Sequence, residues 1–226
     1  MVTPLSLLLA LSLAGDLPGP DGLLAPGATL EKLWGEGSFT EGGALDRDGS
    51  VLFSDIGDRV MRFDPKTSAV TVFREPSGRA NGLIFSPDGR LIAAEGSNTG
   101  GGRRVSVTER DGAVRTLADR YQGKRFNSPN DLAVDRRGRV YVSDPRYAGD
   151  EPRELDFEGV FRVDPDGTVT KLETTAKKPN GVAVSPDGKT LYVADNGPGH
   201  CRRRRGSCRR GRRPGRWASS RSSPAG

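Results

Sequence analysis

Polar side chains recur at one equivalent position in four similar segments of this chain. The segments open with Glu41, Asn81, Asn130 and Asn180. If the fold brought them together, one carboxylate and three amides would form a shared polar site for a ligand. The alternative is local, because Asn or Asp at the start of a strand often satisfies the backbone of the adjoining turn. The agreement of four positions favours a shared site.

The segments that carry these residues predict β-hairpins. They span residues 41–55, 81–95, 130–144 and 180–195, with turn glycines at Gly49, Gly89, Gly138 and Gly188 that are 40, 49 and 50 residues apart. Each reads as a strand, a turn such as Pro87-Asp88-Gly89, and a second strand of β-branched and aromatic residues. The same hairpin is therefore repeated along the chain.

A second, fainter pair of strands lies between these hairpins, at residues 60–73, 105–114 and 159–172. Two hairpins per repeat give four strands in roughly 40–50 residues, the size of a propeller blade. No stretch of ten or more residues has helical periodicity with caps, so an α/β fold is disfavoured. We predict an all-β protein, a β-propeller with about four blades in this chain. The first strand of each blade would face the central channel and bring the four polar residues to one end of it.

The positive charge of the chain is confined to its end. The net charge is +6, but residues 201–226 contain ten Arg and no acidic residue. The remaining residues hold 25 Lys and Arg against 29 Asp and Glu, a net charge of −4. The basic charge therefore does not indicate a nucleic acid partner. Cys201 and Cys208 also lie in this tail, so the rest has no disulfide framework or thiolate metal site.

Both ends of the chain differ from the repeats. Residues 1–14 contain an apolar run of signal-peptide length, too short for a membrane span, and predict export to the periplasm or outside the cell. A wrongly assigned start codon or a disordered leader is the alternative, which would leave a cytoplasmic protein. Residues 15–33, rich in Pro and Gly, predict a flexible lead-in to a partial propeller over residues 34–199.

The Arg-rich tail, residues 200–226, contains no Val, Ile, Leu, Phe, Asp, Glu or Lys. We expect it to be disordered and hypothesise that it is read out of frame after a frameshift near Gly199. A basic arm that binds nucleic acid or anionic surfaces is the functional alternative.

Several longer motifs give the chain a family resemblance. They are Ala118–Asp131, Gly78–Gly82, Glu154–Gly167 and Pro179–Gly188. From about Glu41 to Asn196 the sequence resembles the gluconolactonase and senescence-marker-protein (regucalcin) family. The resemblance implies a six-bladed propeller, here C-terminally truncated, that hydrolyses a small-molecule sugar lactone with a divalent metal.

The resemblance also implies a ligand set for that metal. The family's metal-binding positions fall on Glu41, Asn130 and Asn180, while a fourth ligand, an Asp that opens a later blade, has no counterpart. One carboxylate with amide oxygens is a hard site that suits Ca²⁺, although Zn²⁺, Mn²⁺ or Mg²⁺ are also compatible with the family. The metal would polarise the lactone carbonyl and position the attacking water.

The remaining site residues are expected around this metal. Because the family's usual Asp base is missing, Asp131 is the candidate base, unless it points away along the strand and satisfies backbone groups. The candidate substrate-binding residues, with solvated loop as the alternative, are Arg79, Asn81, Tyr121, Lys124 and Arg125. We interpret the acidic residues that end the second strands, Asp55, Asp144 and Asp195, as structural.

Two other functions stay open at this point. A propeller can bind a ligand or a partner at its channel mouth without catalysis, because fold alone does not choose function. The same metal could also serve an esterase or phosphotriesterase.

Overall fold

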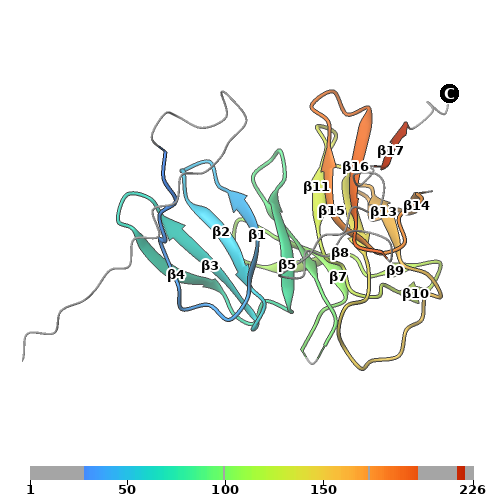
Figure 1. Ribbon diagram of the computed structural model, residues 1–226, viewed down its shortest axis with the longest axis horizontal. Coiled ribbons are helices and arrows are strands. Elements are labelled where there is room, and N and C mark those ends of the chain that lie inside the picture. The colour runs from blue at the N-terminus through green and yellow to red at the C-terminus, as the bar shows by residue number, and fades with distance from the viewer. Residues whose placement is uncertain (1–27, 99, 173, 198–217, 222–226) are drawn as a thin grey trace, which may run out of the picture. The chain divides into compact units, whose positions relative to one another are not determined.

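The computed structural model describes residues 28–98, 100–172, 174–197 and 218–221. The chain divides into two compact units, Met1–Gly37 and Ser38–Gly226, and all the strands named below belong to the second. Within the described ranges there are strands and no helix, which confirms the all-β prediction (Figure 1). No helix that could cross a membrane occurs in this part of the chain. The predicted signal peptide, residues 1–14, lies outside the described residues.

Each large sheet is made from consecutive, antiparallel strands (Figure 1). The first contains β1 (Thr40–Leu45), β2 (Val51–Asp55), β3 (Arg59–Asp64) and β4 (Ala69–Arg74). The second contains β5 (Ala80–Phe85), β6 (Leu91–Glu95), β7 (Arg104–Thr108) and β8 (Val114–Ala118). The third contains β11 (Leu132–Val134), β12 (Val140–Asp144), β13 (Gly159–Val163) and β14 (Val169–Leu172). The fourth contains β15 (Pro179–Val184), β16 (Thr190–Asp195) and β17 (Ala218–Arg221).

These sheets confirm both sets of predicted hairpins. The strong repeats form β1–β2, β5–β6, β11–β12 and β15–β16, and the fainter pairs form β3–β4, β7–β8 and β13–β14. Gly49, Gly89, Gly138 and Gly188 have φ between 70° and 90°, so these turns use backbone conformations that favour glycine. The four-stranded sheets have the strand order of a propeller blade. Closure into a ring of six blades stays a prediction.

Two strand segments differ from the prediction. A small hairpin, β9 (Arg120–Tyr121) with β10 (Lys124–Arg125), turns at Gln122 and Gly123, whose φ angles are 51° and 80°. Positive φ at both turn residues is the type I′ geometry, which Asn-Gly signals far better than Gln-Gly. In the tail, where we expected disorder, Ala218–Arg221 forms β17 and pairs with β16. The rest of the tail lies outside the described residues.

The first strands of the four sheets lie against one another in chain order. β1 contacts β5, β5 contacts β11, and β11 contacts β15. The backbone N–H of Gly82 in β5 donates to the carbonyl of Asn130, at 2.7 Å. A Cβ atom on Gly82 would lie 2.8 Å from the Cα of Asp131, so this close approach requires glycine.

Three apolar clusters join the neighbouring sheets. Leu52 and Val60 of the first sheet pack with Leu83 and Leu91 of the second. A larger cluster between the second and third sheets contains buried side chains from both, with the fully buried Phe126 and Phe161 in it. A third cluster, which includes Val160 and Val193, joins the third sheet to the fourth. Burial of these faces holds the first strands in register.

Candidate functional site

The four polar residues of the sequence repeat lie at the same end of the first strands of the four sheets, β1, β5, β11 and β15, which are called the inner strands below. Glu41, Asn81 and Asn180 are the second residues of β1, β5 and β15, and Asn130 lies two residues before β11. Serines of the second strands bind the next sheet at this level: Ser54 Oγ donates to the Asn81 carbonyl at 2.8 Å, and Ser143 Oγ donates to the Asn180 carbonyl at 2.5 Å. These bonds fix the backbone beneath the amide side chains.

Glu41 and Asn180 have side-chain oxygen atoms that are available to bind a metal. Asn180 Nδ2 donates to Tyr147 Oη at 3.1 Å, a bond that does not use the Oδ1 atom of Asn180. Glu41 is exposed, and within the described residues its carboxylate has no hydrogen bond or ion pair. The half-buried Asn130 uses its backbone N–H and C=O in bonds to Ser143 and Gly82.

The chemistry of these donors fits a hard divalent cation. Among the described residues no group of three or more His, Cys, Asp or Glu could hold a metal ion, so carboxylates alone do not make a site. A cation would need amide oxygens beside the carboxylate of Glu41. Ca²⁺ accepts such mixed oxygen donors readily, whereas structural zinc sites use Cys and His.

Asp131, the candidate base, contacts the neighbouring sheet. Its Oδ2 atom accepts the backbone N–H of Val182 in β15 at 2.8 Å. Burial raises the pKa of the Asp131 carboxyl, and the N–H groups of Val182 and Leu132 oppose that rise. The contact matches the alternative in which Asp131 satisfies backbone groups, while its catalytic role stays a prediction.

Arg79 lies near Asn81, at the start of β5. Its backbone N–H donates to Asp58 Oδ1 at 3.0 Å, and its Nη1 donates to the Ile56 carbonyl at 3.2 Å. Both partners belong to the connection between β2 and β3. The structure therefore brings Arg79 and Asn81 to the same end as the candidate metal ligands.

The other three predicted substrate contacts lie on a separate hairpin. Tyr121, Lys124 and Arg125 belong to the β9–β10 hairpin, and β9 contacts β14, the last strand of the third sheet. The Tyr121 ring packs against Phe161, with centroids 5.2 Å apart, so it contributes to the core. Arg125 donates from Nη2 to the Gly102 carbonyl at 2.8 Å. Among the described residues, none of the three has a hydrogen bond or ion pair with Asn130 or Asn180.

The acidic residues that end the second strands are structural, as predicted. Asp55, Asp144 and Asp195 accept backbone N–H groups just before the inner strand of their own sheet, from Phe39 at 3.2 Å, Ser128 at 2.7 Å and Lys178 at 2.8 Å. Burial raises the pKa of Asp144 to about 7, against the lowering effect of the N–H groups of Asn127 and Ser128. These carboxylates hold the segments that lead into the inner strands.

Sequence reasoning missed Tyr147, which lies between β12 and β13. Its hydroxyl accepts from Asn180 and also from Asn196 Nδ2, at 3.3 Å. No repeated motif marks this position, because the connections between second and third strands differ in length from sheet to sheet.

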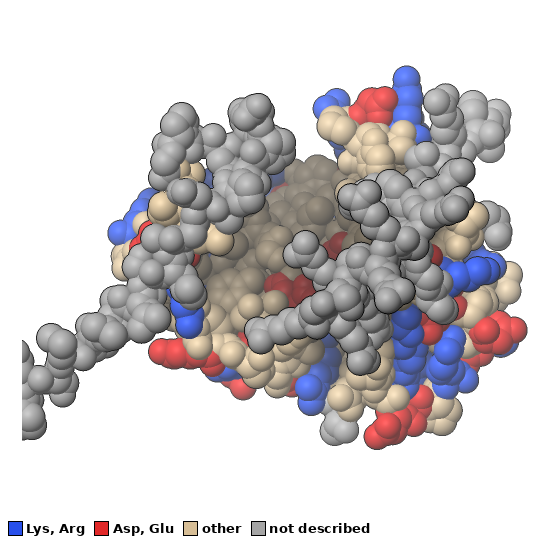
Figure 2. Space-filling view, in the orientation of Figure 1, with Lys and Arg blue, Asp and Glu red and all other residues tan. Residues whose placement is uncertain are grey.

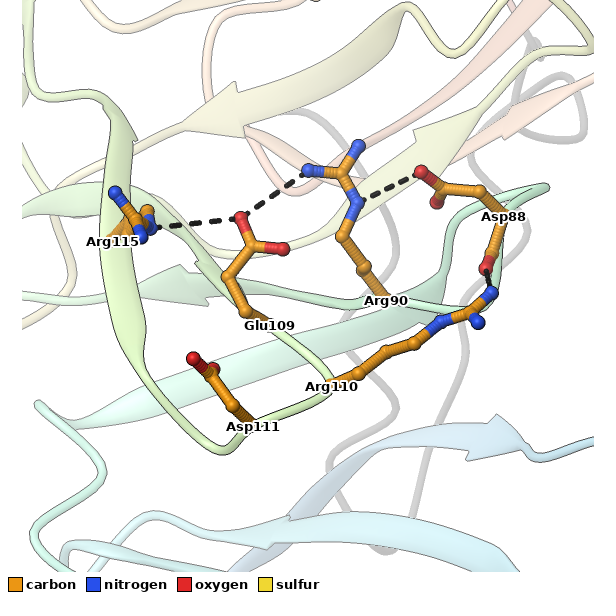
Figure 3. A pocket seen from close by; sticks show the side chains of 6 residues that line it. All are labelled: Asp88, Arg90, Glu109, Arg110, Asp111 and Arg115. Carbon is orange, nitrogen blue, oxygen red and sulfur yellow. Dashed lines mark hydrogen bonds and ion pairs between the residues drawn. The ribbon is translucent and has the colours of Figure 1, made fainter.

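A charged recess of about 540 Å³ lies at the hairpin turns β5–β6 and β7–β8, the opposite ends of those strands from Asn81 (Figure 3). Its arginines are occupied by protein groups: Arg90 pairs with Asp88 at 2.8 Å, and Arg110 donates to the Asp88 carbonyl at 2.8 Å. In Figure 2, by contrast, the hollowed middle of the visible face is mostly tan with some acidic side chains, and most Lys and Arg lie around it. The paired recess is a poor candidate for the reaction site.

Residues 35–202 match the family model described as the SMP-30/Gluconolactonase/LRE-like region. The chain belongs to this family. Membership confirms the family resemblance that the sequence motifs indicated.

Relatives within the SMP-30/gluconolactonase family share about a third of their residues with the chain. The gluconolactonase of Zymomonas mobilis is 34% identical over 198 residues, which are 79% of this chain and 55% of that protein. The solved gluconolactonase of Xanthomonas campestris is 32% identical with a TM-score of 0.66, over 73% of this chain and 57% of that one. The chain thus spans little more than half of these family members.

The fold is shared with a more distant solved structure. The calcium-binding regucalcin of Agrobacterium tumefaciens has a TM-score of 0.54 and 21% identity, over 70% of this chain and 51% of that one. At that identity the likeness concerns the fold alone.

Proposed function

We propose that the chain is part of a hydrolase for a sugar lactone, of the gluconolactonase type. One observation carries the proposal: in a member of this family, Glu41, Asn81, Asn130 and Asn180 lie at or just before the starts of the adjacent strands β1, β5, β11 and β15. The substrate is a small polyhydroxylated lactone such as glucono-1,5-lactone. Export through residues 1–14 is part of the same proposal.

The proposed cofactor is a divalent metal, Ca²⁺ first, held by Glu41, Asn130 and Asn180. When bound, it would supply a positive charge that polarises the lactone carbonyl. Asn130 and Asn180 suit this role because their backbones are fixed by Gly82 and Ser143. Asn81 and Arg79, at the same end, would bind the hydroxyl groups of the sugar.

The proposed base is Asp131, which would take a proton from the attacking water through Oδ1, because Oδ2 accepts the Val182 N–H. Its raised pKa supports this role, since a base works best with a pKa closer to the working pH. The proposal requires Oδ1 to be reachable from the channel side of β11.

Hydrolysis of glucono-1,5-lactone by the purified chain tests the proposal. We expect acid release above the spontaneous rate, loss of that excess with EDTA, and its return with added CaCl₂. Glu41→Ala and Asn180→Ala should each lower kcat/KM by about 100-fold or more, as loss of a direct electrostatic group does. Asp111→Ala, in the recess at the hairpin turns, is the control and should match the wild type.

Each failure has a distinct meaning. A folded chain that never exceeds the spontaneous rate contradicts lactone hydrolysis. Activity that is indifferent to EDTA contradicts the metal. Binding of the lactone without turnover would favour a non-catalytic ligand-binding propeller.

A further inference from the structure

The Tyr147 hydroxyl lies between two asparagine amides. Asn180 Nδ2 donates to it at 3.1 Å and Asn196 Nδ2 donates at 3.3 Å. Asn180 is the second residue of β15 and Asn196 directly follows β16, so both lie at the open end of that hairpin. Tyr147 comes from the connection between β12 and β13. The hydroxyl therefore links the third sheet to the fourth beside a proposed metal ligand.

These two bonds orient the hydroxyl proton. A tyrosine hydroxyl can accept at its oxygen and donate through its O–H, and both amides donate to the oxygen. Among the described residues no group accepts the Tyr147 O–H. The proton consequently points away from Asn180 and Asn196, as a donor without a protein acceptor in this part of the chain.

The ring of Tyr147 is held while its side chain stays accessible. Lys178 Nζ lies 4.8 Å from the ring centroid, a cation–π contact, and the same atom donates to the Arg146 carbonyl at 2.8 Å. Glu158 Oε1 accepts from Lys178 Nζ at 3.3 Å. Tyr147 is nevertheless 45% exposed. An oriented and accessible donor binds a ligand at a low cost in side-chain entropy.

We propose that Tyr147 contacts the substrate, and that its O–H donates a hydrogen bond to an oxygen atom of the sugar lactone or of its aldonate product. The inference rests on the proposed function and adds a residue to its site. Asn180 would bind both Tyr147 and the metal, since its Nδ2 orients the tyrosine hydroxyl while its Oδ1 is left for the metal. Asn196 acts through Tyr147 and is a positioning residue.

The test compares binding and turnover in Tyr147→Phe, which keeps the ring and its contact with Lys178 but removes the hydroxyl. Sodium gluconate binding is measured by titration calorimetry, and glucono-1,5-lactone hydrolysis gives KM and kcat. Loss of one neutral hydrogen bond should raise the gluconate Kd and the lactone KM about 3–10-fold. The kcat should change less than about twofold, because ground-state binding is lost.

Matched variants separate this role from a structural one. Tyr192→Phe, at another exposed tyrosine, should leave Kd and KM unchanged. Asn196→Ala keeps the Asn180 bond but loosens the hydroxyl, and should raise Kd by about twofold or more. This second variant decides the question if Tyr147→Phe does not fold.

The outcomes distinguish the two proposals. Wild-type values of Kd and KM in folded Tyr147→Phe, or of Kd in Asn196→Ala, overturn the inference while lactone hydrolysis stands. The inference is likewise overturned if a lower melting temperature is the only effect of Tyr147→Phe. A folded wild-type chain that neither binds gluconate nor hydrolyses the lactone overturns the proposed function, and the inference with it.

Discussion

Asp131 Oδ2 accepts the backbone N–H of Val182 at 2.8 Å, and this bond ties the residue before β11 to the middle of β15. The contact joins two sheets through a carboxylate that we also propose as a catalytic base. The two roles respond differently to substitution.

Replacing Asp131 therefore separates structure from chemistry. Asp131→Ala leaves the Val182 N–H without its acceptor and should lower the free energy of unfolding by about 1–3 kcal/mol. Asp131→Asn retains an oxygen acceptor, so its stability should lie close to the wild type while hydrolysis falls if the residue is the base. Urea denaturation and the lactone assay measure the two effects. If Asp131→Asn hydrolyses the lactone at the wild-type rate, Asp131 is not the base and has only its structural role.

Gly82 lies where β5 passes closest to β11. In Gly82→Ala the new Cβ would lie 2.8 Å from Asp131 Cα and 2.9 Å from the Asn130 carbonyl, both backbone atoms. We expect a loss of about 1–3 kcal/mol, since the strands must separate to admit the methyl group. Gly43→Ala is the control, because nothing lies within 4 Å of a Cβ there. Equal melting temperatures for the two variants would contradict the close approach.

Glu95 is a buried charge with two partners. Its side chain is 1% exposed and pairs with Arg104 at 2.6 Å and with Arg74 at 3.2 Å. Glu95→Ala leaves the half-buried arginines uncompensated and should cost about 3–5 kcal/mol. Asp88→Ala removes an ion pair whose carboxylate is 55% exposed, and should cost less than about 1 kcal/mol. Chemical denaturation of both variants measures the contrast, and similar losses would refute it.

Asp144 should make stability depend on pH. Its pKa in the folded protein is about 7, above the ordinary 3.8, so the folded state binds more protons between these values. The free energy of unfolding should accordingly fall as pH rises from about 4 to 7, by at most about 1.4 kcal/mol per pH unit from this group. Asp144→Asn should flatten that fall in urea titrations at pH 5 and pH 7. Asp111→Asn, on an exposed turn, should keep the wild-type difference.

The hairpins could be predicted because their signals are local. Gly49 and the other turn glycines mark tight turns, and the flanking residues have strand propensity whatever surrounds them. The β9–β10 turn escaped prediction because Gln122 is not a residue typical of positive φ. Tyr121 was expected to meet substrate, yet its ring packs on Phe161, a contact that depends on how the hairpin folds back.

The candidate site could be predicted only in part. Glu41, Asn81, Asn130 and Asn180 could be grouped because they repeat at equivalent positions of the hairpins. The choice of Glu41, Asn130 and Asn180 as metal ligands came from the family resemblance and stays a prediction. Tyr147 lies 33 residues from Asn180 on a connection with no repeat, so its contact arises only when two sheets meet. The bond from Val182 to Asp131 likewise depends on the approach of β15 to β11, and alternation along one strand does not decide it.

Because each four-stranded sheet is a run of consecutive strands, its hydrogen-bonded ladders depend on no distant part of the chain. A protease that cut the connection between β4 and β5 would leave both sheets whole. The two pieces would retain their own ladders, and the apolar cluster that contains Leu52 and Leu83 would still hold the sheets together. The order of the strands thus makes the hydrogen bonding of each sheet independent of the connections between sheets.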